Sequence, residues 1–186
     1  MRHQTDSTDF DQFVARQQTA AAEAASIDWG RERDEWLKHL DGLYASVESF
    51  LEKYLSTGQI KREYVMVTLN EENIGPYRAK KMVLRIGPQQ VELVPVGTLL
   101  IGSKGRVDVV GPAGVAQLLL VDKRASGPGS LIHVRVGAGG KLPELPTRNP
   151  QQIEWEWRIV TRPPERRFTE ITQQSFFALI MEVTNG

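Results

Sequence analysis

Apolar side chains recur every three or four residues between Asp28 and about Leu55, which predicts one long amphipathic helix. The apolar positions are Trp36, Leu37, Leu40, Leu43, Tyr44, Val47, Phe50, Leu51, Tyr54 and Leu55. Asp28 is suited to cap the N-terminus of this helix, and Gly58 follows its end as a C′ glycine. Gly42 costs ~1 kcal/mol relative to alanine inside a helix, so we expect a neighbouring backbone to approach there.

The apolar stripe needs a partner surface, because an isolated helix is marginal in water and gains most of its stability from tertiary packing. The simpler interpretation is that the stripe packs on a sheet of the same chain. The alternative is an interface with another protein or a second copy of this chain. The candidate interface residues are Leu40, Tyr44, Val47, Phe50 and Tyr54.

Beyond Gly58 the pattern changes to short runs of β-branched and apolar residues, separated by glycine and proline. The strand-type runs cover residues 64–69, 82–86, 91–96, 98–101, 106–110, 115–121, 131–136 and 153–160, and residues 70–76 and 137–150 are expected to be loops. Many short strands without intervening helices indicate an antiparallel meander, sandwich or partly open barrel.

The two ends of the chain add helices. Residues 1–27 are expected to form a polar tail and an alanine-rich helical arm, with the helix at about 9–25, and residues 28–186 a single domain. Near the other end, Thr169 can cap a last helix whose apolar residues are Phe176, Phe177, Leu179, Ile180 and Val183. The fold class is therefore predicted as α+β: N-terminal helices of which one is long and amphipathic, an antiparallel β-meander or barrel-like sheet of about seven or eight strands, and a C-terminal helix.

The run 153–160 alternates apolar and charged residues, which is typical of a half-buried strand. Trp155 and Trp157 share its apolar face, whereas Glu154 and Glu156 share the other. Tryptophans at alternate strand positions usually fill a core, although tryptophan is also enriched at binding surfaces.

Basic residues concentrate in the middle of the chain, although the formal net charge of the whole is zero. Residues 1–61 carry seven basic and eleven acidic side chains, and residues 62–141 carry eleven basic and six acidic ones. If they share one face of the sheet, the candidates for binding an anionic ligand or nucleic acid are Lys81, Arg85, Lys104, Arg106 and Arg135. No aromatic residues interleave with them as single-stranded nucleic acid would require, so the acidic helix can instead offset this charge.

Few residues suggest catalysis. The chain has no cysteine, which excludes disulfides, thiolate metal sites and cysteine nucleophiles. Glycine-rich stretches such as 102–106 lack the strand–turn–helix setting of phosphate loops and are expected to be turns. His133 and Glu154 are the remaining candidates for a site assembled from distant residues, and no cofactor or metal is indicated.

The leading functional hypothesis is a non-enzymatic, cytoplasmic interaction module that self-associates or binds another protein. It rests on the large apolar stripe and the alanine-rich arm, and the chain shows neither an apolar run long enough to span a membrane nor a hydrophobic signal region. Anionic-ligand or nucleic-acid binding by the basic strands, and an enzyme with a dispersed site, remain the alternatives.

Overall fold

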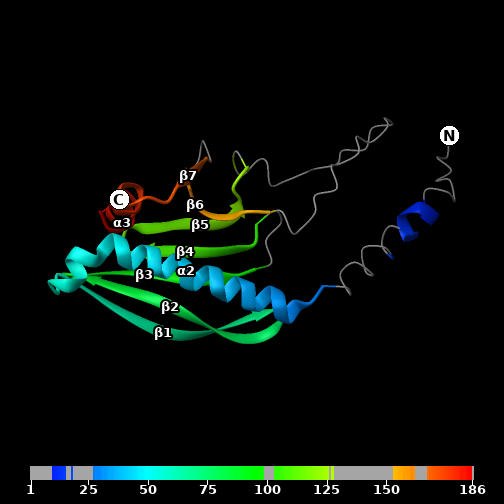
Figure 1. The fold of residues 1–186 in the computed structure, drawn as a ribbon, viewed down its shortest axis with the longest axis horizontal. Coiled ribbons are helices and arrows are strands. Elements are labelled where there is room, and N and C mark those ends of the chain that lie inside the picture. Colours follow the sequence, from blue (N-terminus) through cyan, green and yellow to red (C-terminus); the bar gives the residue numbers. More distant parts are fainter. Residues whose placement is uncertain are drawn as a thin grey trace.

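A computed structural model describes residues 10–15, 18, 27–98, 103–125, 127, 153–161 and 167–185 of the chain. Within these ranges a short helical segment at 10–15 precedes two longer helices and seven strands, which form one sheet (Figure 1). The longer helices are α2 (Trp29–Ser56) and α3 (Gln173–Asn185), and the strands are β1 (Ile60–Glu71), β2 (Gly75–Ile86), β3 (Gln89–Gly97), β4 (Gly105–Gly111), β5 (Gly114–Asp122), β6 (Trp155–Val160) and β7 (Phe168–Glu170). This is an α+β fold, which confirms the predicted class.

The long helix begins and ends close to where the hydrophobic pattern placed it. Asp28 is the N-cap of α2, and its carboxylate accepts a hydrogen bond of 3.0 Å from the Arg31 backbone N–H. After the helix, Gly58 adopts a φ of +72°, a left-handed conformation that favours glycine.

The sheet is an open antiparallel meander in which each strand pairs with its neighbours in the sequence. Among the described strands, β1 and β7 form the two edges, so the barrel-like alternative is not realised. The predicted loop at 70–76 was wrong in extent: the pairing of β1 with β2 continues as far as Glu71 opposite Gly75. Only residues 72–74 turn the chain, because the left-handed Gly75, with a φ of +77°, permits a tight hairpin.

The hydrophobic core lies between one face of the sheet and the two helices. Alternate residues of each strand point toward the helices, because successive strand side chains lie on opposite faces. The largest fully buried side chains are Trp36, Tyr44, Phe176, Leu40, Met82, Leu84, Leu93, Leu118, Leu120, Val47, Val91 and Val107. The hydroxyl of Tyr44 also donates to the backbone oxygen of Lys80 at 2.6 Å, which ties α2 to β2.

The C-terminal helix starts later than predicted. Thr169 lies in β7, and Thr172 caps α3 instead: its hydroxyl accepts from the Ser175 backbone N–H at 3.2 Å, while the Ser175 hydroxyl accepts from the Thr172 N–H at 2.9 Å. The apolar face of α3 packs on α2, with ring centroids 6.1 Å apart for Phe50 and Phe176. The expected strand at 131–136, the loop at 137–150 and most of the alanine-rich arm lie outside the described residues. Over the described part of the chain, neither helix combines the length and the apolar character that crossing a bilayer demands.

Candidate functional site

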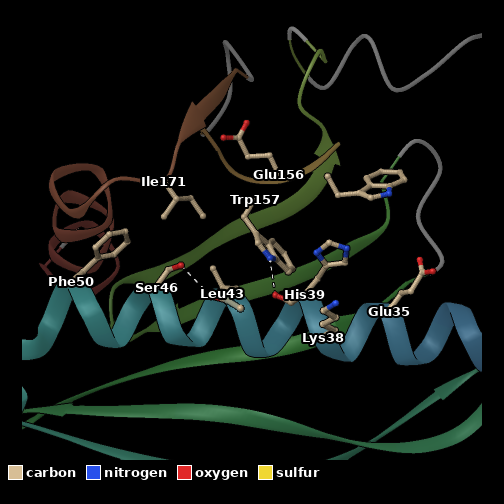
Figure 2. Close-up of a pocket in the computed structure, with 11 residues that line it drawn as sticks. Glu35, Lys38, His39, Leu43, Ser46, Phe50, Glu156, Trp157 and Ile171 are labelled. Carbon is tan, nitrogen blue, oxygen red and sulfur yellow. Dashed lines mark hydrogen bonds between the residues drawn. The ribbon is translucent and has the colours of Figure 1, made fainter. Parts of the chain in front are cut away.

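A cleft of about 580 Å³ opens between α2 and the last strands of the sheet (Figure 2). One wall is a face of α2, and the other comes from β6 and from the link between β7 and α3. The lining residues are Glu35, Lys38, His39, Gly42, Leu43, Ser46, Phe50, Trp155, Glu156, Trp157 and Ile171. The cleft therefore joins residues of the long helix to residues more than a hundred positions later in the chain.

The helical wall follows the spacing of α2. Residues 35, 39, 42, 46 and 50 lie three or four apart, so they form a row beside the buried apolar stripe. Gly42 lies in the middle of this row. Apart from its chain neighbours and the backbone of its own helix, no atom of the described residues lies within 4 Å of the position where a Cβ would be placed. The backbone approach expected at Gly42 was therefore wrong, because the space beside this glycine is the open cleft.

The strand wall is aromatic. Trp155 and Trp157 occupy alternate positions of β6, and each is only half buried. The indole Nε1 of Trp157 donates to the backbone oxygen of His39 at 3.1 Å, and its ring centroid lies 5.9 Å from that of Trp36. Figure 2 shows Trp157 pointing down onto α2 beside His39. Trp157 thus connects the core with the cleft, and its indole ring forms part of the cleft wall.

The two acidic side chains of the cleft are neutralised by basic neighbours. Glu35 accepts from Lys104 Nζ at 2.6 Å and from Arg31 Nε at 2.9 Å. These two hydrogen bonds hold the pKa of the Glu35 carboxyl below its ordinary value. Glu156 is paired with Arg158 at 2.5 Å. Glu35 is therefore held as a carboxylate, which makes it a poor proton donor, and Glu156 is engaged in an ion pair with Arg158.

Lys38 has no carboxylate partner among the described residues, although its exposed ammonium group lies at the cleft. His39 lies beside it, and burial is the main cause that lowers the pKa of its imidazole, with Lys104 adding to the effect. A neutral imidazole has one nitrogen that donates and one that accepts. Across the described residues, no group of three potential metal ligands occurs, and the cleft offers one uncompensated positive charge.

The predicted interface residues separate into two sets. Leu40, Tyr44 and Val47 are at most 2% exposed, because they pack against the chain's own sheet. Phe50 and Tyr54 are partly buried, and the Tyr54 ring centroid lies 6.0 Å from that of Phe177 in α3. Of the five residues, Phe50 is the one that lines the cleft.

The four predicted anion-binding residues that the structure describes are divided between the two faces of the sheet. Lys81, Arg85 and Arg106 lie on the sheet face that points away from the helices, since they alternate with core residues of β2 and β4. Each has a carboxylate neighbour: Lys81 lies 2.7 Å from Glu92, Arg85 3.6 Å from Glu63 and Arg106 2.6 Å from Asp108.

Lys104 lies on the helix side of the sheet, 3.2 Å from Glu32 and 5.4 Å from the centroid of the Trp155 ring. Arg135 and His133 lie outside the described residues, and Glu154 is paired with Lys123 at 3.2 Å. The structure thus brings none of these predicted charged residues into a shared site within the described ranges.

Sequence reasoning missed Lys38 and His39 in the helical wall of the cleft, and it interpreted Gly42 as a site of close packing. The available signal was Gly42 itself, since a glycine inside a helical pattern usually has a packing or functional reason. No protein-family model, curated protein or solved structure significantly matches the chain.

Proposed function

We propose that this protein is a non-enzymatic interaction module that binds an extended, acidic segment of a partner protein, with an aromatic side chain of that segment against the tryptophans. The observation that supports this most is the pairing of two half-buried tryptophans with an uncompensated lysine along a cleft. Tryptophan is enriched among the residues that contribute most to protein–protein binding.

The length of the cleft favours a peptide. The lining runs along α2 from Glu35 to Phe50, which at 1.5 Å per residue is about 22 Å. An extended segment of about seven residues spans that distance. A segment of this kind can place a ring against Trp155 and Trp157 while its backbone reaches His39.

The charged side chains that line the cleft favour a partner segment with negative charge. Glu35 and Glu156 are offset by Lys104 and Arg158, whereas Lys38 makes no ion pair with a described residue. An acidic side chain placed near Lys38 gains attraction, and a basic one is repelled. The alternative of anion binding by the sheet has less support, since Lys81, Arg85 and Arg106 already have carboxylate neighbours.

The energetic cost of a glycine at position 42 also supports the proposal. Glycine in a helix interior costs about 0.5–1 kcal/mol relative to alanine, and no packing contact of Gly42 compensates that cost. The absence of a side chain there keeps the middle of the cleft wide.

The test is selection of random heptapeptides displayed on phage against the full chain, followed by titration of the selected peptides monitored by tryptophan fluorescence. We expect the selected peptides to combine an aromatic residue with Asp or Glu. Lys38→Glu should weaken their binding about tenfold, since one lost charge contact plus one repulsion amounts to roughly 1.4 kcal/mol. Gly42→Leu should abolish binding while raising the stability of the helix.

Lys53→Glu is the matched control, because Lys53 is exposed on the same helix but does not line the cleft. The proposal fails if no motif is enriched. It also fails if the selected peptides bind Lys38→Glu and Gly42→Leu as tightly as the wild type.

A further inference from the structure

The strand β1 is a long exposed edge of the sheet. It has 12 residues and, among the described strands, pairs only with β2 (Figure 1). At 3.4 Å per residue its backbone offers about 40 Å of hydrogen-bonding edge. The opposite edge, β7, has 3 residues. Long unprotected edges pair readily with another strand, and proteins usually shorten or cover them.

The centre of this edge is apolar on both faces. Residues 61–66 are all exposed, and they include Tyr64 at 37%, Val65 at 38% and Met66 at 45%. Successive side chains of a strand point to opposite faces. On the helix side the Tyr64 ring centroid lies 5.6 Å from that of Tyr44, and its hydroxyl donates to Glu48 of α2 at 2.6 Å, so this face is only partly covered. Three consecutive exposed apolar residues, on an edge that no other described strand pairs with, indicate a contact surface rather than scattered surface side chains.

We propose that β1 pairs antiparallel with β1 of a second copy of this chain, with Val65 opposite Val65 of that copy. The two-fold axis is then perpendicular to the sheet, and the two seven-stranded sheets join into one. The proposal does not depend on the cleft, which lies at the β6 end of the sheet, away from β1.

The sequence of β1 is complementary to itself in this arrangement. One half carries the charged run Lys61, Arg62 and Glu63, and the other half carries the uncharged run Val67, Thr68 and Leu69. Antiparallel pairing centred on Val65 places each half opposite the other, so no two like charges face one another. It also places Tyr64 opposite Met66, an aromatic–apolar cross-strand pair.

Two other registers of the same antiparallel strand pair are unfavourable. Centring the pair on Glu63 would place two glutamates opposite each other, and centring it on Arg62 would place two arginines opposite each other. Like charges directly opposite destabilise a strand pair. Within its own chain Arg62 is paired with Glu48, and Glu63 lies near Arg85, so these charges are already engaged beside the edge.

The absence of cysteine from the chain allows a direct test of the register. Val65→Cys should give a disulfide-linked dimer on mild oxidation, because Cα atoms of directly opposite residues lie about 4.5–5.5 Å apart, within disulfide reach. Lys61→Cys is the matched control on the same strand. Its two thiols would lie about 27 Å apart and should remain reduced.

Sedimentation of the unmodified chain gives the second readout. We expect a species of twice the 20.9 kDa chain mass for the wild type, and a monomer with unchanged circular dichroism for Val65→Lys. Val115→Lys, which alters an exposed apolar residue of β5 that is 48% exposed, should remain dimeric. The proposal is overturned if the wild type is monomeric at every concentration, if Val65→Lys stays dimeric, or if Lys61→Cys crosslinks as readily as Val65→Cys.

Discussion

Gly105 and Gly42 show that adding a Cβ atom to a glycine has opposite consequences in different surroundings. At Gly105, where β4 begins, an added Cβ would lie 2.1 Å from Cζ3 of the buried Trp36 ring. At Gly42 the same atom would enter open space. Gly105 is therefore required for the packing of α2 on the sheet, whereas Gly42 leaves room at the surface.

We expect Gly105→Ala to lower the free energy of unfolding by about 1–3 kcal/mol, because the Trp36 ring fills the site and must shift. Gly42→Ala, the matched control, should raise it by about 0.5–1 kcal/mol. Urea denaturation followed by circular dichroism measures both. Equal effects of the two substitutions would contradict the assignment of Gly105 as a packing position.

At the scale of elements, an ion-pair cluster connects the start of α2 to the start of β4. Lys104 is 10% exposed, and its ammonium group lies 2.6 Å from Glu35 and 3.2 Å from Glu32. The hydrogen bond from Lys104 is the largest cause that lowers the pKa of Glu35 below its ordinary 4.5. A carboxyl whose pKa is lower in the folded state stabilises the fold above its ordinary pKa, and this contribution disappears as the pH falls through the folded-state pKa.

Replacing Lys104 should therefore change the free energy of unfolding by an amount that depends on pH. Lys104→Met should lower the free energy of unfolding by about 1 kcal/mol at neutral pH, a value kept small because Glu35 is partly solvent-exposed. The difference from the wild type should shrink once the pH falls below 4.5, where Glu35 takes up a proton. Denaturation of both proteins across the acid range checks this, and a difference that does not change with pH would refute the role of the Glu35 carboxylate.

For the whole molecule, the important feature is that one core holds both helices and the sheet. Buried residues of α2, of β1 to β6 and of α3 form a single hydrophobic cluster. In addition, the backbone oxygen of Val183 in α3 accepts from the Ala113 N–H of the β4–β5 turn at 2.8 Å. Helices that share a core in this way should not unfold separately.

We therefore expect one cooperative unfolding transition, coincident by tryptophan fluorescence and circular dichroism. Leu40→Ala in α2 and Phe176→Ala in α3 should each shift that same transition, by about 2–5 and 3–5 kcal/mol, because both residues are at most 1% exposed. Two separate transitions, or a loss of α3 alone in Phe176→Ala, would show that the helices form independent units.

The sequence by itself determined the local elements. The three- and four-residue spacing of apolar positions, with Asp28 before it and Gly58 after it, predicted α2 almost to the residue, because helix periodicity and capping depend on neighbours along the chain. The same reasoning identified the antiparallel strand-rich half, and it placed Trp155 and Trp157 on one face of β6. It missed the extent of the β1–β2 hairpin and the true cap of α3, because more than one residue near each boundary is of a type that forms turns or caps helices.

The cleft and the exposed edge were decided only by the tertiary structure. His39 and Trp157 are joined by a hydrogen bond across 118 positions, and no local pattern encodes such a contact. Likewise, the composition of β1 predicted a strand, but its position at the end of the sheet order left its outer backbone edge without a partner strand among the described residues. Periodicity specifies which face of an element is apolar, whereas packing of distant elements decides which apolar faces are covered and which stay available for a partner.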